Sequence, residues 1–243
     1  MAKRKYTRKQ LRQPDEFISM SMKVWEVVRK HAPRVIVTIV VAVLVIAGVW
    51  TWSYFADARA SKATGVMSRA FEIYNQTVFP MESKLPPSED GLPRFKTERA
   101  KLEASEKEFT KAIDSSSGAL KTLAVLMRAG VRYELGRYGK ALEDYQTYVK
   151  TGDQQELKFN AMEGIGYCLE GEKQLDKALA AFRELPRDGE NKWLASYHEA
   201  RILAKKGQKK EAKELLQKVV DKAKSKLLQS RAGDQLALIE QGK

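Results

Sequence analysis

Cysteine and histidine are scarce in this chain of 243 residues. Its one cysteine, Cys168, has no partner for an internal disulfide, so the fold must be stabilised by the packing of its core. The same scarcity excludes a lipid-attachment signal near the amino terminus, which needs a cysteine. The two histidines, His31 and His198, have no cysteine or carboxylate pair at ligand spacing beside them. We therefore expect no bound metal and no cofactor.

Charge is absent from the 22 residues between Arg34 and Asp57. A helix of this length covers roughly 33 Å, enough to cross a hydrocarbon core about 30 Å thick. The small-x-small sequences after the run have the form of a cleavage site, but a cleaved signal has a shorter apolar region of about 7–15 residues. The run therefore predicts a retained transmembrane helix at 35–56. Trp50 and Trp52 near one end are typical of the membrane–water interface.

The amino-terminal tail, residues 1–34, is strongly basic. It holds ten lysines and arginines against three carboxylates, and basic flanks stay on the cytoplasmic side of a membrane. Between residues 17 and 28 apolar side chains recur at helical spacing, which predicts an amphipathic helix at the inner interface. Nucleic-acid binding is the alternative role of this tail, but contact with anionic lipid, worth about 1 kcal/mol per basic residue, explains the charge more simply. We expect no nucleic-acid partner.

The residues after the span divide into three parts. An apolar stripe of helical period, with no breaker before it, predicts a juxtamembrane helix at 57–78 that continues the span. Four prolines between residues 79 and 95 predict a loop. The remainder, 96–243, has helical periodicity throughout and ends in a segment with the polar pattern of a capping helix.

A small residue paired with a larger one recurs along 96–243. Three such pairs are spaced by four residues: Ala141 with Tyr145, Ala178 with Phe182, and Ala212 with Leu216. The alanines of successive pairs are 37 and 34 residues apart, and a further small residue stands twelve positions before each: Ala129, Gly166 and Ala200. Small residues at such spacing let two helices approach closely where they cross, while the larger residue fills the space beside them.

This pattern resembles the tetratricopeptide repeat, a helix–turn–helix unit of 34 residues, and it is clearest in the stretch YELGRYGKALEDY. The expected fold is all-α, a single transmembrane helix followed by a tetratricopeptide-repeat-like α-solenoid. We expect a fourth unit in which the juxtamembrane helix combines with the pair Ser105 and Phe109. Gly136 and Gly207 lie five residues before their alanines, at the turn between two helices. In the middle copy Gly171 lies seven residues before Ala178, so we expect a reshaped turn there.

No arrangement of residues in the sequence indicates an enzyme. The glycines of GIGYCLEG follow no strand, so close helix packing explains them better than phosphate binding. Within it, Cys168 fits a small core residue better than a reactive thiol. The adjacent carboxylates Glu143 and Asp144 are expected on a solvated helix face. We therefore expect no catalytic residues.

Arrays of helical repeats bind partners on the concave surface formed by the first helix of each unit. Transferring the groove-facing positions of tetratricopeptide repeats to this chain predicts nine partner-binding residues: Tyr133, Glu134, Asn160, Glu163, Tyr167, Glu170, Tyr197, Arg201 and Lys205. Tyrosines with mixed charge suit an extended polypeptide, because aromatic faces contact apolar side chains and charges fix the register. The alternative is that these residues only solvate a helix face.

The whole layout resembles the ancillary SecYEG translocon subunit family (YfgM-like), most clearly in GVWTWSYFADARASKA and WLASYHEARILAKKGQKKEAKELL. This resemblance implies a single-pass protein of the bacterial inner membrane, with a cytoplasmic amino terminus and a periplasmic repeat domain. It also implies association with the Sec translocon, periplasmic chaperones and exported polypeptides. The proline loop and the longer basic tail depart from the family pattern. A structural adaptor in a cell-envelope complex for division, polysaccharide export or secretion is the alternative, and a cryptic enzyme or its regulatory subunit is a weaker one.

Overall fold

The computed structural model describes residues 16–79 and 91–241, so the first part of the basic tail and most of the proline loop lie outside the described residues. The chain divides into two compact units, residues 1–58 and 59–243. Helix α1 (Glu16–Tyr74) is one uninterrupted α-helix. It therefore includes the segments that the sequence predicted separately as an amphipathic helix and a span, together with the predicted juxtamembrane helix as far as Tyr74, four residues before its predicted end at 78.

The apolar part of α1 from Ile36 onward is exposed in the first unit. Side chains such as Ile46 and Trp52 have 67% and 75% of their surface accessible. From Ile36 onward this helix is long and apolar enough to cross a membrane. The hydroxyls of Thr38 and Thr51 donate hydrogen bonds to backbone carbonyls one turn earlier, so these polar side chains are satisfied within the helix.

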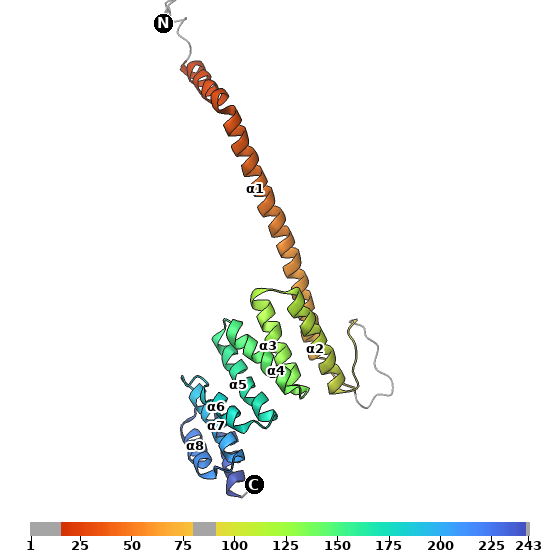
Figure 1. The fold of residues 1–243 in the computed structure, drawn as a ribbon, viewed down its shortest axis with the longest axis vertical. Coiled ribbons are helices and arrows are strands. Elements are labelled where there is room, and N and C mark those ends of the chain that lie inside the picture. Colours follow the sequence, from red (N-terminus) through yellow and green to blue (C-terminus); the bar gives the residue numbers. More distant parts are fainter. Residues whose placement is uncertain (1–15, 80–90, 242–243) are drawn as a thin grey trace, which may run out of the picture. The chain divides into compact units, whose positions relative to one another are not determined.

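The second unit is built from the end of α1 and eight further helices in the described residues. These are α2 (Glu98–Ser115), α3 (Gly118–Glu134), α4 (Tyr138–Thr151), α5 (Gln155–Gly171), α6 (Leu175–Arg183), α7 (Asn191–Lys205), α8 (Lys209–Lys222) and α9 (Lys226–Glu240). From α2 onward, each helix packs mainly against its neighbours along the chain (Figure 1). A succession of helices that contact mainly their neighbours defines an α-solenoid, so the predicted fold is confirmed.

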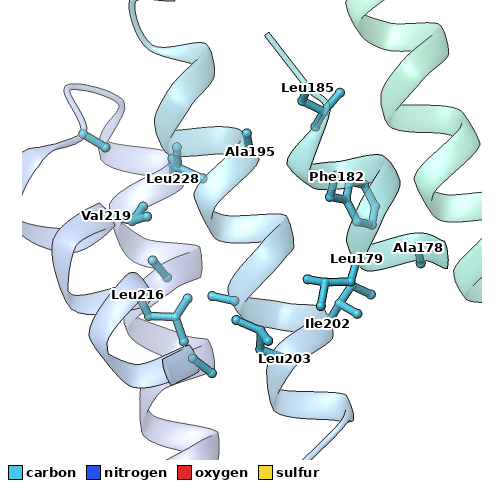
Figure 2. Close-up of a cluster of buried hydrophobic side chains, with 14 of the residues drawn as sticks. Ala178, Leu179, Phe182, Leu185, Ala195, Ile202, Leu203, Leu216, Val219 and Leu228 are labelled. Carbon is cyan, nitrogen blue, oxygen red and sulfur yellow. The ribbon is translucent and has the colours of Figure 1, made fainter. Parts of the chain in front are cut away.

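The predicted small–large pairs lie in the interior of the solenoid. The repeats are α3 with α4, α5 with α6, and α7 with α8, and every alanine of the three pairs is fully buried. Phe182 and Leu216 are also fully buried, whereas Tyr145 is partly buried. The carboxy-terminal core joins α6, α7, α8 and α9, whose apolar side chains point toward one another (Figure 2).

The end of α1 acts as the first helix of an additional repeat, with α2 as the second. Met67 and Ala70 of α1 are buried with Phe109 of α2. The ring of Phe71 meets that of Phe109 edge-on, with centroids 5.4 Å apart. Beyond α1, Phe79 donates a backbone hydrogen bond of 2.9 Å to the carbonyl of Phe95. This bond closes the chain segment that contains the prolines.

The turns within the three repeats are the same, and the reshaped turn expected in the middle copy is not found. In each, three consecutive N–H groups donate to carbonyls four, three and five residues earlier. The central residue has positive φ: Gly136 at 71°, Lys173 at 61° and Gly207 at 80°. Lys173 therefore occupies the glycine position, and Gly171 belongs to the preceding helix. The expectation failed because lysine does not signal a left-handed conformation.

Lys173→Gly should stabilise the folded chain by about 0.5–1 kcal/mol. The left-handed conformation costs a side-chain-bearing residue about 1–2 kcal/mol, and the greater entropy of glycine in the unfolded chain offsets part of that gain. Gly207→Ala in the equivalent turn should instead destabilise the folded chain. Urea denaturation followed by circular dichroism measures both, and a Lys173→Gly midpoint below that of the parent chain would contradict the assignment.

Candidate functional site

Tyrosines from the repeats form one connected surface. The ring centroid of Tyr133 on α3 lies 5.4 Å from that of Tyr138 and 6.1 Å from that of Tyr167 on α5. His198 on α7 continues the series, with its ring 5.2 Å from Tyr167 and 5.4 Å from Tyr197. All four tyrosines are partly exposed. We call Tyr133, Tyr138, Tyr167 and Tyr197 the tyrosine surface.

A three-residue ion cluster lies at one side of this surface. Glu170 on α5 pairs with Arg201 and, at 2.6 Å, with the Lys205 ammonium group of α7. Burial alone would raise the pKa of Glu170, but the hydrogen bonds and charges of Arg201 and Lys205 lower it overall. The Arg201 guanidinium also lies over the Tyr167 ring, 5.3 Å from its centroid. The predicted residues of α5 and α7 therefore contact one another directly.

A buried histidine, which the sequence analysis did not select, organises the middle of the cluster. His198 is 2% exposed, and its Nε2 lies 2.7 Å from Oε1 of Glu163. Its ring stacks on Phe182 at a centroid distance of 4.8 Å. The Tyr167 hydroxyl donates a longer bond of 3.4 Å to the same Glu163 oxygen. Glu163 therefore fixes side chains of two neighbouring repeats, and no sequence pattern pairs residues 35 positions apart.

Two predicted residues lie outside this cluster. Glu134 accepts a 2.7 Å hydrogen bond from the hydroxyl of Tyr74, at the end of α1. Asn160 is exposed on the first turns of α5. It lines a separate hollow of about 420 Å³ with Phe159, Pro186 and neighbouring polar residues. The structure thus brings seven of the nine predicted residues into one cluster and places Asn160 elsewhere.

Close packing of aromatic rings explains the glycines of GIGYCLEG. A β-carbon at Gly164 would lie 2.5 Å from the Tyr145 ring, and one at Gly166 would overlap the ring of Phe182. These contacts agree with the helix-packing interpretation. Cys168 in the same segment is fully buried, and burial raises the pKa of its thiol to about 12. Such a thiol is protonated at neutral pH and is a poor nucleophile.

A buried ion network joins α2, α3 and α4. Asp144 accepts hydrogen bonds from Arg128, at 2.8 and 2.9 Å, and from Arg132 at 2.7 Å. Arg132 also pairs with Glu106 of α2 at 2.8 Å, and Glu106 pairs in turn with Arg137. The side chain of Asp144 is only 8% exposed. The expectation of a solvated face is therefore wrong for Asp144, because arginines of α3 cover it, although the adjacent Glu143 is exposed.

Because of these ion pairs, the free energy of unfolding depends on pH. Burial alone would raise the pKa of Glu106, but Arg132, Arg137 and Lys140 lower it overall, as Arg201 and Lys205 do for Glu170. Since both pKa values are lower in the folded chain, the stability they contribute is complete above about pH 4.5 and is lost as pH falls through the folded values. The urea midpoint should fall between about pH 5 and pH 3. Glu106→Gln should reduce that fall, and an unchanged dependence would contradict the assignment.

The described residues contain no group of three potential metal ligands among histidine, cysteine, aspartate and glutamate. A second hollow of about 400 Å³ lies between the start of α3 and the end of α4, lined by small, polar and apolar residues including Ala119, Val125 and Thr147. In these hollows, as in the tyrosine cluster, no nucleophile, base and oxyanion donors converge within the described residues.

Comparison with known proteins identifies the family. Among solved structures, the chain is similar to the crystal structure of YrrB, described as a TPR protein with an unusual peptide-binding site. The identity is 24%, the match covers 56% of this chain and 68% of that chain, and the TM-score is 0.45. No curated protein gives a significant match. The family described as "Tetratricopeptide repeat-like domain" matches residues 28–237. The chain belongs to the tetratricopeptide repeat-like domain family.

Proposed function

We propose that this chain is a membrane-anchored, non-enzymatic module that binds polypeptides on the surface of its repeat domain. The observation that supports the proposal best is the connected tyrosine surface, to which α3, α4, α5 and α7 contribute across three repeats. Partly exposed tyrosines supply large contact areas at a small cost in conformational entropy, which makes them frequent in protein interfaces.

The proposed anchor is the apolar part of α1. Its exposed side chains have no covering partner in the described part of the first unit, and its length suffices to cross a hydrocarbon core. The excess of basic residues in 1–34 favours a cytoplasmic amino terminus. In this topology the repeat domain lies in the periplasm of a bacterium.

This topology predicts a defined proteolytic pattern. In spheroplasts, a protease that cannot cross the inner membrane should digest residues after 57 and leave a fragment of roughly 7 kDa, which contains the tail and the span. An amino-terminal epitope detects this fragment by immunoblotting. Protection of the repeat domain in intact spheroplasts, with digestion only after lysis, would reverse the proposed orientation.

The proposed partners are the Sec translocon, periplasmic chaperones and the polypeptides that pass between them. The resemblance of the chain to ancillary translocon subunits supports this choice, together with a polypeptide-sized surface on a membrane-anchored domain. Purification of the tagged full chain in mild detergent should recover translocon subunits. If none is recovered while a single envelope protein co-purifies at fixed stoichiometry, the structural-adaptor function replaces the translocon function.

A further inference from the structure

The carboxylates next to the tyrosine surface already have partners within the protein. Glu170 is held by Arg201 and Lys205, and Glu163 is held by His198. A charged side chain of a bound polypeptide would have to share its partner with one of these internal contacts. That charges of the site fix the register of the ligand stays a prediction.

Hydrogen-bond donors, by contrast, are available on the same surface. In the described part of the chain, the hydroxyls of Tyr133, Tyr138 and Tyr197 have no protein partner, unlike those of Tyr74 and Tyr167. The oxygen atoms of these three hydroxyls are accessible to solvent. The surface thus offers aromatic faces and phenolic donors, whereas one oxygen of each neighbouring carboxylate, Oε1 of Glu163 and Oε1 of Glu170, already accepts hydrogen bonds within the protein.

This combination matches the chemistry of proline. A proline-containing backbone in the polyproline II conformation has few N–H donors and exposes its carbonyl oxygens. A surface that binds it must therefore supply hydrogen-bond donors rather than acceptors. Proline rings pack well on aromatic faces, and the preformed conformation lowers the entropy lost on binding. We infer that the tyrosine surface binds uncharged, proline-containing segments of extended polypeptide, an inference that rests on the proposed function.

The test uses the full chain in nonionic-detergent micelles and three fluorescent peptides of equal length. The first contains proline, leucine and serine. In the second every proline is replaced by alanine, and in the third every leucine is replaced by glutamate or lysine. Fluorescence anisotropy gives the dissociation constants. The proline peptide should bind roughly tenfold more tightly than either of the others, since one good hot-spot contact is worth that factor.

Variants connect this preference to the tyrosine surface. Tyr133→Ala should weaken binding of the proline peptide roughly tenfold. Tyr133→Phe keeps the ring and removes the donor, so it should weaken binding about threefold. Leu238→Ala, at an exposed position on the capping helix α9, should have no effect. Far-ultraviolet circular dichroism checks that each variant is folded.

The outcomes separate the inference from the proposed function. Equal binding of all three peptides, with loss in Tyr133→Ala, would overturn the proline preference and leave polypeptide binding at this surface intact. Tighter binding of the charged peptide would also overturn the preference. Absence of binding by every peptide would contradict both the preference and the proposed function.

Discussion

Replacing Asp144 by alanine is expected to destabilise the folded chain by about 3–5 kcal/mol. Asp144 is the common acceptor of Arg128 and Arg132, and the side chains of both arginines are only 15% exposed. Removing the carboxylate leaves Arg128 without its ionic partner in a site that water barely reaches. Its hydrogen bond to the Thr110 hydroxyl is the one that remains. Desolvation of that charge is then no longer compensated, which makes the loss much larger than for a surface ion pair.

Glu143→Ala is the matched control for this prediction. Glu143 precedes Asp144 on the same helix but is exposed, so its replacement should change the free energy of unfolding by no more than about 0.5 kcal/mol. Urea denaturation of both variants, followed by circular dichroism, gives the comparison. Equal midpoints for Asp144→Ala and Glu143→Ala would show that the buried network contributes nothing to stability.

Gly166→Ala should destabilise the fold by about 1–3 kcal/mol, although alanine is the better helix former. Gly166 lies in α5 where the Phe182 ring of α6 covers its α-carbon, so an added methyl group would overlap the ring. Phe182 is fully buried and stacks on His198, which limits its ability to move aside. The strain would therefore reach the cluster beneath the tyrosine surface.

Gly130→Ala tests whether the loss at Gly166 comes from packing. Gly130 lies in α3, and a β-carbon there would meet its nearest atom, the Tyr145 hydroxyl, at 3.9 Å. Without a clash, alanine should stabilise this helix by about 0.5–1 kcal/mol. Opposite shifts in the urea midpoint are the expected result. A destabilisation of equal size in both variants would instead point to a general intolerance of side chains at helical glycines.

Periodicity and spacing were sufficient to predict the repeats. The alanines at 141, 178 and 212 could be recognised because a close helix crossing admits few side chains, and each is fully buried. The turns at Gly136 and Gly207 could be recognised because glycine is the usual residue at positive φ. Lys173 adopts the same conformation without any such signal, so the sequence wrongly predicted a reshaped turn there.

The site could be predicted only in part, because its contacts join different helices. The nine positions were obtained by transferring repeat positions, which places residues on a helix but does not pair them across repeats. His198 was missed since its partner Glu163 lies one repeat away. Asp144 was misplaced because its arginines belong to α3, the other helix of its own repeat. Asn160 illustrates the opposite error, because it shares a helix with Glu163 but lines a different hollow.

Site-specific photocrosslinking in living cells tests the central claim, that the tyrosine surface binds polypeptides, most directly. A photoreactive phenylalanine analogue placed at position 133 should form adducts with several exported polypeptides, and the adducts should decrease when protein export is blocked. The same analogue at position 143, on the exposed side of α4, serves as the control and should form few adducts. Equal adducts at both positions, or none at position 133, would contradict a polypeptide-binding role for this surface.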